Sequence, residues 1–185
     1  MHHLLIFGPP GVGKGTQSAL IAEKLNLFHL STGEYLRKAI DDGTELGLKA
    51  KDIVEKGMLV PDDIMIGIVA QALEENTDGK AGFILDGFPR TLEQAKALEV
   101  IFQKMGVKDI CVLYLIAHDD ELVDRLLKRG RKDDTEEIIR HRLKIYLDST
   151  KPIIDYYRNT KEVLDIDGVG AIEDIFGIIS EKLGR

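Results

Sequence analysis

Short runs of apolar residues alternate along the chain with longer segments in which apolar residues recur every three or four positions. The short runs are almost uniformly apolar, which is typical of parallel strands that are buried on both faces. The longer segments have the period of amphipathic helices. The pattern therefore predicts strands at residues 3–7, 82–86, 109–116 and 162–166, with a weaker strand at 27–30.

This alternation of strand and helix predicts an α/β fold, a parallel five-stranded sheet with helices on both faces, because right-handed crossovers place helices against the sheet. Two segments do not fit this alternation of strand and helix. Residues 31–60 are helical without a strand, and residues 128–134 are short and charged. We expect one domain whose core is 1–30, 61–127 and 135–185, with the other two segments as arms outside the sheet.

Three helix starts carry a polar residue followed three positions later by Glu or Gln, the spacing of a capping box. The three pairs are Ser31 with Glu34, Thr91 with Gln94, and Asp134 with Glu137.

Composition restricts the class of protein further. The chain is 44% hydrophobic and 31% charged, as in soluble globular proteins, and its net charge of −7 argues against the broad basic surface of nucleic-acid binders. Its one cysteine, Cys111, excludes an internal disulfide and a Cys-rich zinc site. No apolar run approaches the roughly 20 residues that span a bilayer. We expect a cytoplasmic protein with no nucleic-acid or membrane partner.

The segment GPPGVGKGTQ lies between the first predicted strand and the following helix. Its spacing, Gly8 to Gly13 and Lys14, is typical of a phosphate-binding loop. Glycines let backbone N–H groups approach phosphate oxygens, and the helix N-terminus adds about half a positive charge. A plain Gly/Pro-rich turn with a solvated lysine is the alternative. Here Gly15 stands between Lys14 and the hydroxyl residue, Thr16.

With this loop the sequence resembles the nucleoside monophosphate kinases, adenylate kinases above all. The resemblance continues in LSTGEYLRKAI, EKGMLVPDDI, FILDGFPRTLEQA and DRLLKRGRKDDTEEIIRHRLKIY, and so covers nearly the whole chain. It implies a P-loop three-layer fold with a monophosphate-binding arm at 31–60 and a short lid at 128–134. It also implies a monomer that catalyses reversible, Mg²⁺-dependent transfer of a phosphoryl group from ATP to AMP.

The resemblance assigns the ATP side of the site. It implies that Arg125 covers the donor adenine, and that Arg129, Arg131 and Arg142 surround the transferring phosphoryl group. The segment DIDGVGAIED matches a loop that borders this adenine, although a plain strand–helix loop is an equal alternative. The implied ATP-binding residues are Gly11, Val12, Gly13, Lys14, Gly15, Thr16, Arg125, Arg129 and Gly170; the implied catalytic residues are Lys14, Arg90, Arg129, Arg131 and Arg142.

The resemblance also assigns the acceptor side, where Arg90 would clamp the AMP phosphate. Gln94 has two interpretations, because it either completes the helix cap of Thr91 or reads the acceptor adenine; the second is favoured. The implied AMP-binding residues are Thr32, Arg37, Gly57, Val60, Gly87, Arg90 and Gln94.

Asp86 ends a predicted strand, at the edge where open α/β sheets bind ligands. A carboxylate there suits Mg²⁺ held through water, and the alternative is a bond to its own turn. Only Gly130 separates Arg129 from Arg131, so the lid has no room for a zinc-binding insert.

Two other functions are weighed against this one. A UMP/CMP kinase is disfavoured by Thr32 and by FPRTLEQ, because the resembling pyrimidine kinases tend to have Ala and Asn-containing versions at these places. A GTPase-like nucleotide switch is disfavoured because no Asn-Lys-x-Asp signature is present and the Asp-x-x-Gly pattern at 165–168 comes too late in the chain.

Overall fold

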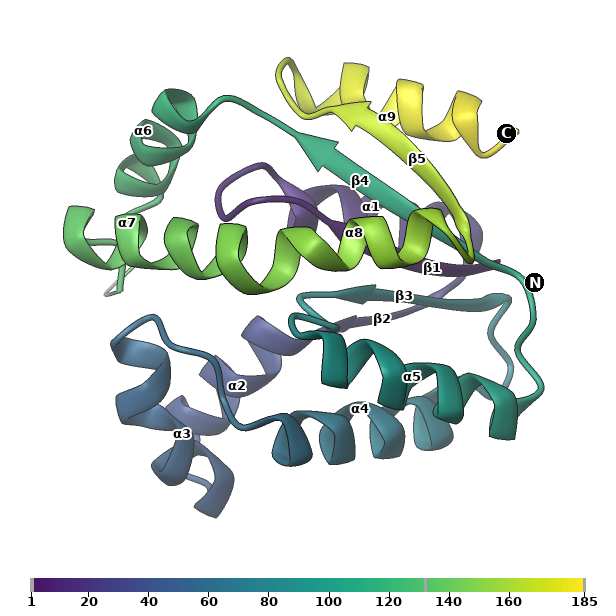
Figure 1. The fold of residues 1–185 in the computed structure, drawn as a ribbon, viewed down its shortest axis with the longest axis horizontal. Helices are drawn as coiled ribbons and strands as arrows, with labels where there is room; N and C mark the ends of the chain where they lie inside the picture. Colours follow the sequence, from purple (N-terminus) through teal and green to yellow (C-terminus); the bar gives the residue numbers. More distant parts are fainter. Residues whose placement is uncertain (1, 132, 185) are drawn as a thin grey trace.

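The computed structural model describes residues 2–131 and 133–184, without the side chains of Asp119 and Asp120. Its centre is a five-stranded sheet in the order β2-β3-β1-β4-β5, and every neighbouring pair is parallel (Figure 1). The predicted fold class is therefore confirmed. The strands are β1 (His2–Phe7), β2 (Phe28–Ser31), β3 (Gly82–Asp86), β4 (Ile110–Ile116) and β5 (Glu162–Asp167).

Helices cover both faces of the sheet and make three layers, because alternate residues of each strand point to opposite faces. In β1, Leu5 and Phe7 join one hydrophobic cluster, and Leu4 and Ile6 join the other. The first cluster is completed by α4 (Asp62–Asn76), α5 (Leu92–Met105) and α8 (Lys151–Arg158), and the second by α1 (Lys14–Leu25), α6 (Asp119–Arg129) and α9 (Ile172–Lys182).

The remaining helices extend beyond the carboxyl ends of the strands (Figure 1). On one side lie α2 (Thr32–Asp41) and α3 (Glu45–Glu55), within the predicted arm; on the other lies α7 (Glu136–Ile145), which follows the predicted lid. The lid segment contains Lys132, and the predicted core contains residues 1 and 185, all outside the described residues.

A π-helical turn, η1 (Tyr146–Thr150), interrupts the helical run between α7 and α8. Pro152 lies in the first turn of α8. Proline lacks the N–H of a regular helix, and its ring clashes with the carbonyl four residues earlier. A π-helical turn is wider than an α-helical turn, and placed just before a proline it relieves that clash. Pro152 therefore accounts for the position of η1.

One predicted helix start is confirmed and another is wrong. Thr91 caps α5, since its hydroxyl accepts a hydrogen bond from the Gln94 N–H at 3.2 Å. Ser31 occupies the N-cap position of α2 but makes no side-chain cap bond. Its hydroxyl instead donates to Asp86 Oδ2 at 3.4 Å, because the neighbouring strand brings a carboxylate within reach.

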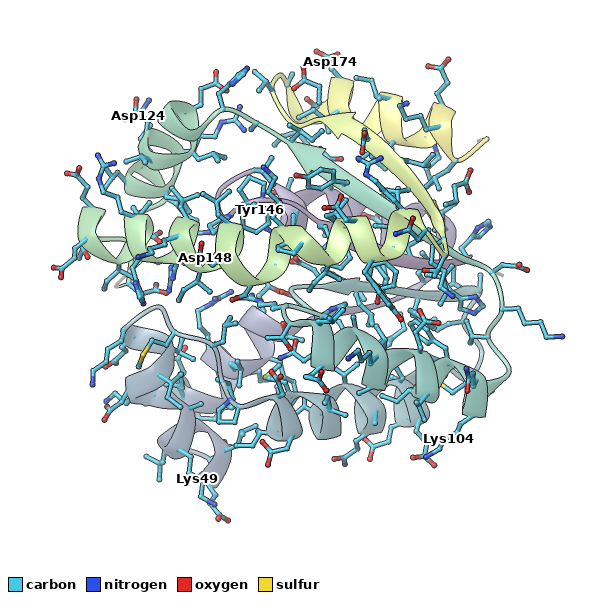
Figure 2. All side chains as sticks on the ribbon, in the orientation of Figure 1. Lys49, Lys104, Asp124, Tyr146, Asp148 and Asp174 are labelled. Carbon is cyan, nitrogen blue, oxygen red and sulfur yellow. The ribbon has the colours of Figure 1, made fainter. Side chains whose placement is uncertain are left out.

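Charged side chains lie on the outer surface of the molecule. Figure 2 shows Lys49, Lys104 and Asp174 on outer helices, pointing away from the sheet. Within the described part of the chain, no helix has the length and apolar character needed to cross a bilayer.

Candidate functional site: a cationic cavity

A cavity of about 440 Å³ lies at the carboxyl ends of β1 and β3, between the arm and the lid. This volume is within the range of ligand pockets, about 300–1,000 Å³. Elements far apart in the sequence contribute to its lining. Of the predicted site residues it brings together Gly11, Gly13, Lys14, Gly15, Thr16, Thr32, Arg37, Gly57, Val60, Asp86, Gly87, Arg90, Gln94, Arg125, Arg129, Arg131 and Arg142.

The loop between β1 and α1 presents the N-terminus of α1 to this cavity. Gly13 is the N-cap, with φ 100°, a left-handed conformation that a side chain would oppose. Lys14 Nζ donates to the carbonyl oxygens of Gly8 at 2.8 Å and Pro9 at 3.0 Å. Burial lowers the pKa of the Lys14 ammonium to about 8, an effect that the Asp86 carboxylate opposes. The loop therefore has the backbone geometry and the cation of an anion site.

Two predicted ATP contacts, Val12 and Gly170, do not line the cavity. The Val12 side chain is buried in the hydrophobic cluster under α1. Gly170 belongs to the loop after β5, and this loop lies close to the cavity because Arg125 Nη1 donates to the Gly168 carbonyl at 3.1 Å. Arg125 thus connects α6 to the loop that the resemblance associates with an adenine.

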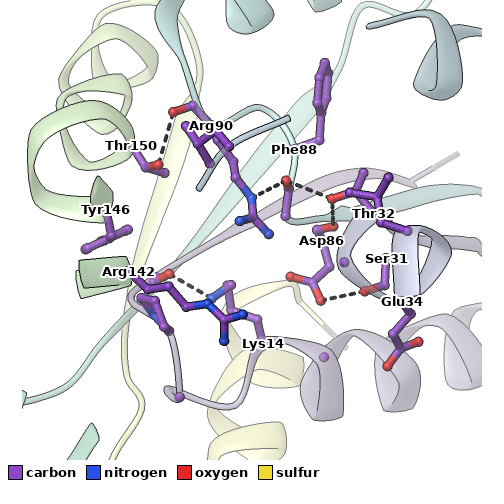
Figure 3. A pocket seen from close by; sticks show the side chains of 18 of the residues that line it. Lys14, Ser31, Thr32, Glu34, Asp86, Phe88, Arg90, Arg142, Tyr146 and Thr150 are labelled. Atoms are coloured by element: carbon purple, nitrogen blue, oxygen red, sulfur yellow. Dashed lines mark hydrogen bonds between the residues drawn. The ribbon is translucent and has the colours of Figure 1, made fainter. Parts of the chain in front are cut away.

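The turn after β3 positions Arg90 through one carbonyl group. Arg90 Nε donates to the Gly87 oxygen at 2.7 Å, and Thr32 Oγ1 donates to the same oxygen at 2.9 Å (Figure 3). Gly87 has φ 80°, and a Cβ there would lie 2.7 Å from Thr32 Oγ1 and 2.8 Å from Arg90 Nη2. Only glycine allows Thr32 and Arg90 to approach the turn this closely.

The backbone of Arg90 is fixed at both ends. Its N–H donates to Gln94 Oε1 at 2.7 Å, and its carbonyl accepts from the Thr150 hydroxyl at 3.1 Å (Figure 3). Burial lowers the pKa of the Arg90 guanidinium, with Asp86 opposing and Arg142 adding to the shift. The guanidinium stays charged, since arginine is protonated at any physiological pH. Arg90 is therefore a rigidly held cation inside the cavity.

The donor set around Asp86 fits Mg²⁺ that keeps most of its water. The carboxylate is buried at the cavity wall, and Thr16 lines the same cavity. No group of three His, Cys, Asp or Glu side chains in the described residues is placed to hold a metal ion. One carboxylate and one hydroxyl suit an ion whose other ligands are waters and substrate phosphates, the usual manner of Mg²⁺.

Arg129 and Arg131 of the lid and Arg142 of α7 converge on two aspartates. Asp134 Oδ2 accepts from Arg129 Nε at 2.8 Å and from the Arg131 N–H at 3.1 Å. Asp134 Oδ1 accepts from Arg129 Nη2 at 2.7 Å and from Arg142 Nη1 at 3.5 Å. Arg142 Nη2 also pairs with Asp133. The Asp134 side chain is fully buried, and it orients the guanidinium groups of Arg129 and Arg142 while it holds the backbone of Arg131.

The predicted cap of α7 by Asp134 and Glu137 is wrong by one residue. Thr135 occupies the N-cap, and its hydroxyl accepts from the Ile138 N–H at 3.4 Å. Charge-assisted hydrogen bonds to arginine are about twice as strong as neutral ones, so they determine where Asp134 points. The sequence signal was available in the arginines on both sides of Asp134.

We expect Asp134→Asn to lower the free energy of unfolding by roughly 1–3 kcal/mol at neutral pH, because it removes the buried negative charge that pairs with Arg129 and Arg142. Burial would raise the pKa of Asp134, but the Arg129 and Arg131 hydrogen bonds and the charges of Arg129 and Arg142 bring it below the usual value. Because the folded pKa is depressed, this stabilisation is present above the unfolded pKa and is lost as pH falls through the folded value.

Urea unfolding of the wild type and the variant at neutral and acidic pH measures this effect. The difference in unfolding free energy should shrink below about pH 4. Asp124→Asn is the matched control, since Asp124 is exposed on α6 (Figure 2) and should change stability little. Equal stability of Asp134→Asn and wild type at neutral pH would contradict the role assigned to this carboxylate.

The cavity is strongly cationic although the chain carries a net charge of −7. Two carboxylates, Glu34 and Asp86, line it. Burial lowers the pKa of Arg37, and the charge of Arg131 lowers it further, so cations of the arm and the lid act on each other across the cavity. Such a site attracts a polyanion. The basic side chains that line it are Lys14, Arg37, Arg90, Arg125, Arg129, Arg131 and Arg142.

The contribution of η1 to the cavity was not predicted. Tyr146 and Thr150 of η1 line the cavity next to Ile145, the last residue of α7, and Thr150 binds the backbone of Arg90. A helical hydrophobic pattern does not show where a π turn changes the direction of its side chains. Pro152 was the one signal of irregularity, and it does not specify which residues face inward.

Comparisons with known proteins agree with one another. A family model described as adenylate kinase matches residues 6–162. The chain is 48% identical to adenylate kinase 1 of Nostoc sp. over 184 residues, which cover all of both chains. It is also 48% identical to an adenylate kinase of Mycobacteroides abscessus over 98% of this chain and 99% of the relative. It is 45% identical to an adenylate kinase of Bacteroides thetaiotaomicron over the full length of both.

Proposed function

The chain belongs to the adenylate kinase family, and from that premise we propose that its cavity binds ATP and AMP and transfers the γ-phosphoryl group between them, giving two ADP. The observation that carries the proposal is the convergence of seven basic side chains on one cavity, from the phosphate loop, the arm, the β3 turn, the lid, α6 and α7. A pyrimidine monophosphate kinase and a nucleotide switch are not favoured, since the full-length relatives named above are adenylate kinases.

We assign the ATP phosphates to the N-terminus of α1. Backbone N–H groups of Gly11 to Thr16 and the Lys14 ammonium would bind them, and Arg125 would cover the adenine. Arg125 supports this role because it already joins α6 to the loop after β5. Val12 and Gly170 do not line the cavity. We still propose that their backbones lie next to the bound ATP.

We assign AMP to the opposite side of the cavity, between the arm and the β3 turn. Arg37 and Arg90 would bind its phosphate, and Gln94 would contact its base. Gly87 contributes through the carbonyl that positions Arg90. The remaining members of the acceptor site are Thr32, Gly57 and Val60, all on the cavity wall.

This arrangement would promote phosphoryl transfer by aligning the two nucleotides and by neutralising the negative charge of their phosphates. The two nucleotides would meet with their phosphates end to end. Arg129, Arg131 and Arg142 would surround the transferring group, replacing Asp133 and Asp134 with phosphate oxygens as partners. Mg²⁺, held through water by Asp86 beside Thr16, would neutralise part of the phosphate charge.

Water must be kept from the transferring group, because water would accept it in place of AMP. We propose that residues 31–60 and 128–134 move as arm and lid and close over the substrates. The core of 1–30, 61–127 and 135–185 would hold the phosphate loop fixed. We further propose a cytoplasmic monomer that acts on free nucleotides without zinc, nucleic acid or membrane, consistent with its acidic charge and lone cysteine.

A coupled assay of ADP formation tests the proposed function. MgATP is supplied with AMP, UMP, CMP or GMP in turn, and without acceptor. We expect ADP to form rapidly with AMP, only slowly with the other acceptors, and not without acceptor. Preference for UMP or CMP would identify a pyrimidine kinase, and ATP binding without acceptor-dependent ADP formation would favour a nucleotide switch.

The lowered pKa of Lys14 predicts a pH dependence. Protonated Lys14 attracts phosphate, and in the free enzyme it loses its proton as pH rises through about 8. We expect kcat/KM for MgATP to fall above that pH, because this parameter reports ionisation of the enzyme form to which MgATP binds, before ATP is present. Bound phosphates raise the pKa of Lys14, so kcat should stay level to higher pH.

Initial rates over a range of MgATP concentrations, at saturating AMP and at pH values from about 6 to 10, measure both profiles. Lys14→Arg is the control, since any activity that it retains should show no such fall. A wild-type kcat/KM that stays constant through pH 10 would contradict the assignment.

A further inference from the structure

We propose that Asp62 determines acceptor specificity by fixing the side-chain amide of Gln94 in one orientation, so that the site accepts a 6-aminopurine monophosphate and rejects the 6-oxopurine analogue. This inference rests on the proposed function, because it concerns the monophosphate acceptor of the same cavity. Asp62 itself is not among the cavity-lining residues.

The Gln94 amide is held from both ends. Gln94 is 2% exposed and lines the cavity. Its Nε2 donates to Asp62 Oδ1 at 2.8 Å, and its Oε1 accepts from the Arg90 N–H at 2.7 Å. Each group of the amide therefore has one partner supplied by the protein.

These partners permit only one orientation of the amide. A carboxylate at neutral pH only accepts hydrogen bonds, and a backbone N–H only donates. Flipping the Gln94 amide would place its oxygen against Asp62 and its NH₂ group against the Arg90 N–H. Both contacts would then be repulsive, in a buried setting where an unsatisfied polar group is costly.

Asp62 is itself held in place. The Thr91 hydroxyl donates to Asp62 Oδ2 at 2.8 Å, and the same hydroxyl oxygen accepts from the Gln94 N–H. Asp62 begins α4, which lies beside α5 (Figure 1), and a carboxylate is favoured in the first turn of a helix. Hydrogen bonds thus link Asp62 at the start of α4 to Thr91 and Gln94 at the start of α5.

The fixed amide has consequences for the base that it meets. After its two protein contacts, Gln94 retains one N–H donor and one oxygen lone pair. A 6-aminopurine offers a donor at position 6 next to an acceptor at N1, and a 6-oxopurine offers the reverse. An amide that rotates freely can flip to suit either base. An amide fixed by Asp62 and Arg90 suits one base and opposes the other.

The experiment compares AMP with IMP, which carries a 6-oxo group and is otherwise the same nucleotide. Steady-state kcat and KM for both acceptors are measured for wild type, for the near-isosteric Asp62→Asn, and for Asp62→Ala in case the first variant folds poorly. Asp63→Asn is the matched control, because Asp63 is exposed in the same helical turn. Thermal unfolding checks that each variant is folded.

We expect wild type to prefer AMP, and the ratio of kcat/KM for AMP to that for IMP to fall about tenfold or more in both Asp62 variants. The change should arise mainly from KM of the monophosphate, and Asp63→Asn should keep the wild-type ratio. A wild type without preference, or folded Asp62 variants that keep the full preference, would overturn the inference.

Failure of the proposed function would look different. If wild type forms no ADP from ATP and AMP, the proposed reaction is wrong. The orientation of Gln94 is then still tested by calorimetric titration of the wild type and the variants with AMP and IMP. Loss of AMP selectivity in the Asp62 variants would support the inference there as well, and unchanged selectivity would overturn it.

Discussion

Arg90→Ala is expected to lower kcat for ADP formation by about 10³-fold or more, because the acceptor phosphate would lose the clamp that aligns it with the transferring phosphoryl group. Arg90 is held at three points, with hydrogen bonds to its side chain, its N–H and its carbonyl. The two backbone bonds survive the substitution, so the turn after β3 should stay folded.

Steady-state kinetics and thermal unfolding of the purified variant measure both parts of this prediction. Lys96→Ala is the control, because Lys96 lies on the following helix, α5, and pairs with Glu93 at an exposed position. The control should keep wild-type kcat. A folded Arg90→Ala enzyme with near-wild-type kcat would refute the clamp that we assign to this residue.

Arg129→Ala is expected to produce a loss of the same order in kcat, for a different reason. In the structure Arg129 is bound to Asp134 through two hydrogen bonds, and we expect it to exchange this partner for the transferring phosphoryl group. Without Arg129, ATP still meets Lys14 and the phosphate loop. The loss should therefore fall on kcat more than on KM for ATP.

Arg140→Ala provides a control with the same change of residue type. Arg140 lies on α7 near Arg142, but its side chain is 66% exposed and pairs with Glu136. Exposed pairs of this kind contribute little, so kcat and stability should stay close to wild type. Equal losses in the two variants would indicate a general effect of charge rather than a site at Arg129.

The strands and their parallel arrangement were predictable, although their order in the sheet was not, because a parallel sheet buried on both faces has a distinctive sequence. β3 was predicted with its exact bounds, and the others within one residue at either end. The polar residues at the ends of strands were also informative. Asp86 lines the cavity because the carboxyl ends of parallel strands meet at one edge of the sheet. Lys14 lines it because it is the first residue of α1, which begins at that edge.

Side-chain partners were predicted less well than positions, because a local pattern does not include neighbours that are distant in sequence. Ser31 and Asp134 both have the spacing of capping residues, yet each binds a charged partner instead. In each case a cap bond competes with a charged group brought from elsewhere in the fold. Local spacing identified Ser31 and Asp134 as hydrogen-bonding residues but did not identify their partners.

Gln94 illustrates the same limit within the candidate site. Its sequence context offered two roles, a helix cap and a base contact, and its side chain contacts Arg90 and Asp62. Asp62 lies in another helix, and the sequence marks it only as an acidic residue in a first turn. Specificity that arises from such a contact becomes visible only when the two helices are seen together.

The most direct test of the central claim is a crystal structure with a bis-adenosine polyphosphate, in which two adenosines are joined through their phosphates. We predict one adenosine beside Arg125, the other beside Gln94, and the phosphate chain between Lys14, Arg90 and the lid arginines. A ligand bound elsewhere, with these cations directed into solvent, would contradict the account.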